Sequence, residues 1–145
     1  MNTDSPATAQ LRWDDPEVIR RVVTSARTVA VIGASPDPAR PSHGVARYLQ
    51  DAGLRIFPVN PSIDTLFGVQ AYPSLADLPE PVDIVDVFRR PEYTVDIAEA
   101  AVAAKAGALW LQLGVVNEQA ARIAAQGGLD VVMNRCLAIE HRRLT

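Results

Sequence analysis

Four arginines in this chain follow apolar segments that stop abruptly. Arg40, the adjacent pair Arg89 and Arg90, and Arg135 each come soon after such a segment. The guanidinium group offers a planar fork of hydrogen-bond donors that matches the oxygens of a phosphate. If the apolar segments are parallel strands of one sheet, the arginines meet at one edge, with only Asp37 evident against them. This pattern indicates an anionic ligand.

The segment between residues 33 and 44 has residue types that suit a phosphate. Gly33 allows a tight turn after the run Thr28 to Ile32, and Gly44 lies in the first turn of a helix that Ser42 is expected to cap. A helix N-terminus carries free N–H groups and a partial positive charge. The sequence reads Gly-Ala-Ser-Pro from residue 33 rather than G-x-G-x-x-G, so the dinucleotide signal is weak. The alternative is that both glycines serve only turning and packing.

The end of the second apolar segment discriminates between cofactors. A domain that binds NAD usually has Asp or Glu there to hold the ribose hydroxyls. Residues 55–61 of this chain, which end at Asn60 and Pro61, contain no carboxylate. This argues against NAD and leaves NADP open, since the extra phosphate of NADP prefers an arginine. On residue type alone, Asn60 is an ordinary turn residue.

The sequence contains none of the common catalytic motifs. G-x-x-x-x-G-K-[ST], G-x-S-x-G and H-E-x-x-H are all absent, and no metal motif links the two histidines. Cys136, beside Arg135, is interpreted as a small, partly buried thiol rather than a nucleophile. Asp86 lies inside an apolar strand, where we expect a structural ion pair with an arginine. We therefore predict no catalytic residues and no metal ligands, and lean against an enzyme.

Strands alternate with helices along the chain. The run from Thr28 to Ile32 is rich in β-branched residues and continuously apolar from Val29 onward, which is typical of a strand buried on both faces of a parallel sheet. Further strands are expected at 54–59, 82–88, 108–113 and 129–133, with helices at about 42–52, 91–105 and 118–125. These elements predict a Rossmann-like, three-layer α/β fold with a doubly wound, mostly parallel sheet of five to six strands. The expected order is 3-2-1-4-5-6, with a short third strand near residues 70–72. Asp14 to Glu17 indicates an extra N-terminal helix.

Length and composition limit the class of protein. The 145 residues suit one domain, which we place at residues 14–145 behind a flexible arm of residues 1–13. The net charge of −3 disfavours a general nucleic-acid binder. A single cysteine suits a reducing compartment, and no apolar run is long enough for a membrane span. We expect a cytoplasmic protein with neither nucleic acid nor membrane as a partner.

Several motifs together resemble a known family. They are similar to the small, single-domain CoA-binding proteins, which in turn resemble the N-terminal CoA-binding domain of the succinyl-CoA synthetase α subunit. The similarity covers about residues 15–144. One departure is Asn134, because many family members have Asp before the Arg-Cys pair. The motifs that carry the resemblance are residues 31–35, 40–42, 48–49, 58–61, 85–90, 110–114 and 132–136.

The resemblance implies a Rossmann-like domain that binds coenzyme A. The diphosphate and the 3′-phosphate of CoA, the latter with a charge of about −2, suit the arginine edge. The adenine is expected against apolar residues such as Val59, Pro61 and Phe88. The residues that the resemblance places around the ligand are Gly33, Ala34, Ser35, Arg40, Asn60, Pro61, Phe88, Arg89 and Arg90. Val59, expected beside the adenine, completes the cofactor-binding set together with four residues that follow the strand ends: Ser42, His43, Gly44 and Gly114.

Three functions remain compatible with the sequence. The first, which we prefer, is a module that binds CoA or an acyl-CoA without chemistry of its own. The second is an NADP-linked oxidoreductase or nucleotide sensor, for which no hydride-acceptor site is evident. The third is a subunit that completes an acyl-CoA synthetase in trans. A homodimer or a partner protein is compatible with each of them.

Overall fold

A five-stranded parallel sheet forms the centre of the computed structural model, which describes residues 12–145. Its strands are β1 (Thr28–Ile32), β2 (Arg55–Val59), β5 (Ile84–Val87), β6 (Ala108–Leu111) and β7 (Asp130–Met133). They lie in the order β2-β1-β5-β6-β7, and every neighbouring pair is parallel. The predicted doubly wound α/β class is therefore confirmed.

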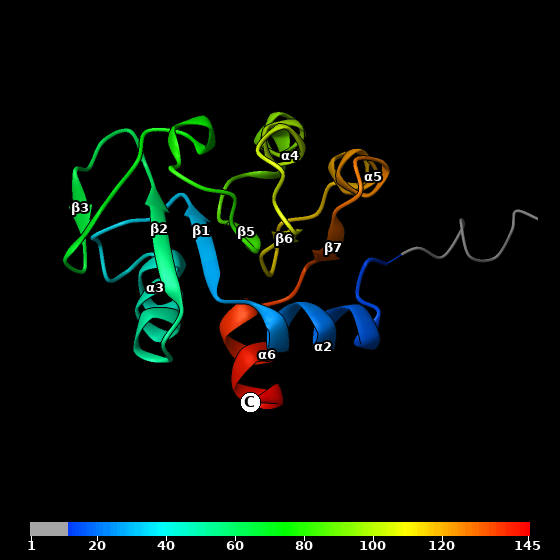
Figure 1. Cartoon of the computed structure of the whole chain (residues 1–145), viewed down its shortest axis with the longest axis horizontal. Helices are drawn as coiled ribbons and strands as arrows, with labels where there is room; N and C mark the ends of the chain where they lie inside the picture. The colour runs from blue at the N-terminus through cyan, green and yellow to red at the C-terminus, as the bar shows by residue number, and fades with distance from the viewer. Residues whose placement is uncertain (1–11) are drawn as a thin grey trace, which may run out of the picture.

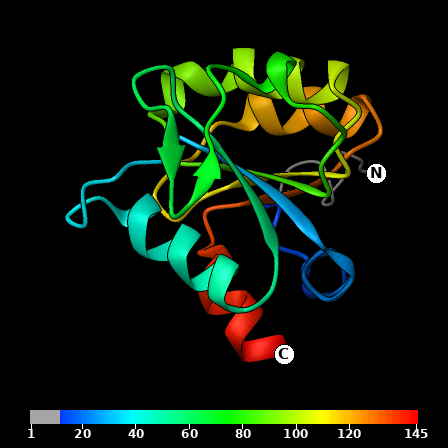
Figure 2. The same ribbon diagram turned by 60° about the vertical axis from the view of Figure 1, so that its left-hand side comes forward.

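Helices cover both faces of the sheet and make a three-layer molecule (Figure 1). On one face lie α4 (Thr94–Ala103) and α5 (Glu118–Gln126). On the other lie α3 (Pro41–Asp51), α6 (Leu137–Leu144) and α2 (Pro16–Ser25), the extra N-terminal helix that the sequence predicts. Figure 2 shows the same two helical layers from the side, with the sheet between them. Within residues 12–145, no helix is both long enough and apolar enough to cross a membrane.

The alternation of side chains along the strands produces two cores. In β1, Val29 and Val31 face the layer of α2, α3 and α6, whereas Ala30 and Ile32 face α4 and α5. The residues of β1 after Thr28 are buried, so the strand can be apolar throughout. Two packed faces explain why the sequence pattern is continuous rather than alternating.

The direction in which the chain winds changes at β1. The connection from β1 to β2 passes through α3 on one face, and the connections from β5 to β6 and from β6 to β7 pass through α4 and α5 on the other. The carboxyl ends of β1 and β5 are neighbours at this switch point. In open α/β sheets, ligands bind in the crevice outside such a point.

The expected third strand near residues 70–72 does not join the sheet. Residues Val69–Gln70 form β4, which pairs antiparallel with β3 (Thr65–Leu66) in a separate hairpin. Only Tyr72 reaches the main sheet, through a single parallel bridge to Val59. Pro73 follows at once, and its missing N–H prevents the ladder from continuing.

Both ends of the described chain have structure that the sequence did not predict. Residues 1–11 of the expected arm 1–13 lie outside the described residues. Trp13 is docked, because its main-chain oxygen accepts from the Met133 N–H at 2.8 Å and its indole donates to Glu118 at 2.8 Å. At the other end, α6 was not predicted. The apolar residues Leu137, Ala138 and Leu144, together with the buried His141, recur at a helical spacing that could have indicated it.

Asp86 does not form the expected ion pair. It lies on β5 opposite Val31 of β1 and Trp110 of β6, fully buried among the strands. Neither carboxyl oxygen has a hydrogen-bond partner among the described residues, and no arginine contacts it. Burial raises the pKa of the Asp86 carboxyl well above its ordinary value. Burial therefore favours the protonated, neutral form of this carboxyl.

Candidate functional site

Gly33 is required by the close approach of two strand ends. Its φ is +88°, and a Cβ atom at this position would lie 2.8 Å from the main-chain oxygen of Phe88. The Gly33 N–H donates to the Val59 carbonyl, and the Phe88 N–H donates to the Ile32 carbonyl. The loops after β1, β2 and β5 are thus tied together at the switch point, as predicted from the residue types.

The N-terminus of α3 points into this region without a side-chain cap. Arg40 occupies the N-cap position and makes no side-chain cap hydrogen bond, and the first turn contains no acidic residue. By contrast, Asp15 caps α2 and Asn117 caps α5. The free positive end of α3 can attract an anion.

The predicted cap at Ser42 is wrong. The N-cap lies two residues earlier, at Arg40, and the helix starts at Pro41, which suits the first helical position because that position needs no N–H. Ser42 is buried within the first turn, and its hydroxyl donates to the Gly33 carbonyl at 2.9 Å. Its role is to hold α3 against the β1 loop.

A cavity of about 980 Å³ opens at the carboxyl ends of β1, β5 and β6. This volume is at the upper end of the range for small-molecule sites. The cavity brings together most of the predicted set: Gly33, Ala34, Ser35, Arg40, Ser42, Asn60, Phe88, Arg89, Arg90 and Gly114. Residues from five separate parts of the chain therefore meet at one site.

Three of the four arginines line this cavity. Arg40, Arg89 and Arg90 are exposed, and within residues 12–145 none of them has a carboxylate oxygen within 4.0 Å. Arg135 is different, because it donates to Asp14 at 2.9 Å and lies 3.8 Å from Glu140. That hydrogen bond to Asp14 raises the pKa of the Arg135 guanidinium. Three cations, rather than the expected four, remain for a ligand.

A second cavity of about 490 Å³ adjoins the first. Gly33, Asn60 and Arg89 contribute to both linings. Val59 and Pro61, which we expected beside an adenine, lie in the second cavity together with Leu75 and Ile97. Arg89 therefore stands between a larger cavity with the other two arginines and a smaller one with an apolar wall.

Two predicted residues line neither cavity. His43 points back to the loop, where its Nδ1 lies 3.0 Å from the Ser35 carbonyl and its ring packs edge-on against Phe67. Gly44 is exposed on α3, and no atom lies within 4 Å of the position its Cβ would take. Both are close to the site, and neither has a contact that assigns it to a ligand.

Several lining residues were missed by the sequence analysis. Gln112 is buried, and its side-chain oxygen accepts from the Leu137 N–H at 3.1 Å, which fixes the start of α6 beside the cavity. Tyr93, Leu113, Cys136 and Ile139 also line the larger cavity. Ile139 could not be assigned without α6. Within the described residues, no group of three or more His, Cys, Asp or Glu side chains could hold a metal ion.

Comparison with known proteins identifies the family of this chain. A family model described as CoA binding domain matches residues 27–142. The chain belongs to this CoA-binding domain family. The resemblance found in its motifs is thereby confirmed, and the matched range contains every strand and arginine of the candidate site.

Individual relatives support the assignment. The uncharacterized protein YneT of Bacillus subtilis is 41% identical over 123 residues, which cover 85% of this chain and 91% of that protein. A solved protein from Thermus thermophilus superposes with a TM-score of 0.84 at 43% identity, covering 90% of this chain and 99% of the other. An ADP-forming acetate–CoA ligase II of Archaeoglobus fulgidus is 32% identical over 95 residues. These residues span 63% of this chain and only 14% of that ligase.

Proposed function

We propose that this domain binds coenzyme A across the two adjoining cavities at the switch point. The phosphate groups lie at the N-terminus of α3, where the Gly33 turn brings the main chain close and Arg40, Arg89 and Arg90 supply donors. The adenine lies in the smaller cavity, against Val59 and Pro61. The pantetheine arm then extends through the larger cavity toward Gly114.

The observation that carries this proposal is a set of three arginines around the N-terminus of α3 that have no carboxylate partner within residues 12–145. In a chain of net charge −3, cations without carboxylate partners at a cavity point to an anionic ligand. CoA supplies both a diphosphate and a separate phosphate monoester, so it can satisfy more than one arginine.

The same site disfavours NAD. The residue at the end of β2 is Asn60, and its side chain is already engaged: its amide donates to the Ala34 carbonyl at 2.7 Å, and its oxygen accepts from the Ser62 N–H at 2.8 Å. The carboxylate that would hold a ribose diol in an NAD site has no counterpart there. Binding without catalysis is the function that these side chains support best.

A thermal-shift panel with CoA, NAD, NADP and ATP tests the proposal. A ligand at 100 times its Kd stabilises the folded state by about 2.7 kcal/mol. For a domain of this size, that corresponds to a rise in Tm of roughly 5–10 °C. We expect this rise with CoA and none with NAD. A clear rise with NAD or NADP and no response to millimolar CoA would overturn the assignment.

A second candidate function is that the domain supplies the CoA-binding part of a larger synthetase. The ligase from Archaeoglobus fulgidus, in which a similar segment forms 14% of the chain, is the observation that favours it. Incubating the purified chain with acetate, ATP and CoA distinguishes an enzyme from a module. We expect no acetyl-CoA to form, and formation by this chain alone would refute both candidates.

A further inference from the structure

The larger cavity has an apolar end that the phosphates of CoA do not need. In the described part of the chain, four large apolar side chains are exposed: Leu113 (64%), Ile139 (52%), Val116 (51%) and Tyr93 (46%). Three of them, Tyr93, Leu113 and Ile139, line the same cavity as the arginines. Exposed apolar groups that gather in a concave site, rather than scatter over a surface, mark a place where an apolar group is buried.

The two ends of this cavity are separated along the sheet. The arginine end lies at the carboxyl ends of β1 and β5, where Arg40 and Arg89 are found. Leu113 follows β6, the next strand along, and Ile139 lies on α6 after β7. With strands about 4.8 Å apart, the end of β6 is roughly 10 Å from that of β1. A ligand that fills both ends must therefore be long and amphiphilic.

We infer that the natural ligand is an acyl-CoA whose acyl chain lies on Leu113 and Ile139, rather than free CoA. This inference rests on the proposed CoA site. The pantetheine arm alone would not use these side chains well, because its amides need polar partners and Leu113 and Ile139 offer none. An acyl chain joined to the thiol continues from that arm into the apolar end. Covering Leu113 and Ile139 then removes their apolar surface from water.

Calorimetric titration of the native protein with CoA, acetyl-CoA and hexanoyl-CoA provides the test. Full burial of one methylene tightens binding by about fourfold. A partly covered hexanoyl chain should therefore bind at least about tenfold more tightly than CoA, with acetyl-CoA in between. The quantity to compare is the ratio of the hexanoyl-CoA affinity to the CoA affinity.

Three variants locate the effect. Leu113→Ser and Ile139→Ser should each reduce this ratio to about threefold or less, because they remove apolar surface from the cavity. Val116→Ser is the matched control, since Val116 is as exposed as Ile139 but does not line the cavity. It should keep the native ratio.

The outcomes distinguish a failure of the acyl-CoA inference from a failure of the proposed CoA binding. If the native protein binds neither CoA nor hexanoyl-CoA, the proposed function fails. If CoA binds and the ratio is close to one, only the acyl-CoA inference fails. A high ratio that survives both serine substitutions in the cavity would also overturn it. A dimer of the native protein would overturn the inference too, if sedimentation without ligand shows the dimer and both Ile139→Ser and Val116→Ser dissociate it. In that case a second copy of the chain covers the apolar side chains.

Discussion

The side-chain amide of Asn60 donates to the main-chain carbonyl of Ala34 at a distance of 2.7 Å. This hydrogen bond joins the end of β2 to the loop that follows β1. A second hydrogen bond, donated by the Ser62 N–H to the side-chain oxygen of Asn60, fixes the orientation of the amide. An amide at this position thus holds the loop that forms one wall of the candidate site, and a carboxylate could not donate in the same way.

Substitution of Asn60 should therefore separate positioning from charge. Asn60→Ala removes the hydrogen bond and should lower the free energy of unfolding by about 0.5–1.5 kcal/mol. Asn60→Asp places a carboxylate against the Ala34 carbonyl and among the arginines, so it should weaken CoA binding by more than tenfold and more than Asn60→Ala does. Urea denaturation and calorimetric titration measure the two effects. Equal affinities for the two variants would contradict this role.

Gly33 should be intolerant of any side chain. Gly33→Ala places a Cβ 2.8 Å from the Phe88 oxygen at a φ of +88°, which should cost about 1–3 kcal/mol of stability. Gly44→Ala is the matched control, because no atom lies within 4 Å of the new methyl group and Gly44 is helical. That variant should be as stable as the native protein or up to about 1 kcal/mol more stable. Thermal unfolding of both variants checks this, and equal losses would show that Gly33 is not under steric constraint.

The adjacent arginines should contribute unequally to CoA binding. Arg89 lines both cavities, and its guanidinium lies over the Tyr93 ring at 4.6 Å, whereas Arg90 lines only the larger cavity. Arg89→Ala should cost about 1.5–3 kcal/mol of binding free energy, as expected for a charge-assisted hydrogen bond. Arg90→Ala should cost less than about 1 kcal/mol.

A third arginine provides the control for that comparison. Arg47→Ala removes an exposed arginine of α3 that lies outside both cavities and 3.6 Å from Asp51. Calorimetric titration at low and at high salt should give this variant the same affinity for CoA as the native protein has under the same conditions. If Arg89→Ala and Arg90→Ala also bind as the native protein does while remaining folded, the phosphates lie elsewhere.

The sequence predicts the sheet and most of the site because both depend on local patterns. Largely apolar runs identify β1 and its neighbours, and the position of a residue just after a strand places it at the ligand edge. That reasoning correctly brings Gly33, Arg40 and Arg89 together.

The missed features depend on contacts between distant residues. Arg135 follows a strand as the other arginines do, yet Asp14, 121 positions away, engages it. Ile139 reaches the cavity only because α6 folds back beside β6, where Gln112 holds its first turn. An ion pair is expected for Asp86 because buried charges are usually paired, but neither of its carboxyl oxygens has a hydrogen-bond partner in the part of the chain that the structure describes.

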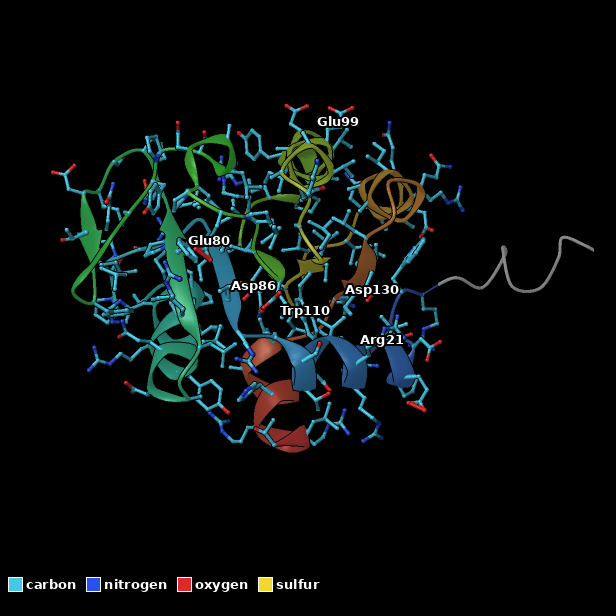
Figure 3. All side chains as sticks on the ribbon, viewed as in Figure 1. Arg21, Glu80, Asp86, Glu99, Trp110 and Asp130 are labelled. Atoms are coloured by element: carbon cyan, nitrogen blue, oxygen red, sulfur yellow. The ribbon has the colours of Figure 1, made fainter. Side chains whose placement is uncertain are left out.

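Asp86 should make the stability of the protein depend on pH. Figure 3 labels Asp86 and Trp110, which are cross-strand neighbours and lie between the sheet and the layer of α2 and α6. Burial raises the pKa of the Asp86 carboxyl in the folded state above its value in the unfolded chain, which is about 3.9. Above that pH the unfolded chain loses the proton and the folded state keeps it. The free energy of unfolding therefore falls as pH rises, until the pH reaches the folded-state pKa.

Asp86→Asn isolates this effect, because it removes the titration and nearly preserves the shape. The stability of the variant minus that of the native protein should increase from pH 4 upward, by at most about 1.4 kcal/mol for each pH unit. His141 also titrates: burial lowers its pKa, so it costs stability as pH falls below about 6.5, the opposite slope. It is present in both proteins, so its contribution cancels in the difference. Urea denaturation at pH 4, 5, 6, 7 and 8 measures that difference. A difference that stays constant over this range would show that Asp86 ionises in the folded protein as it does in the unfolded chain.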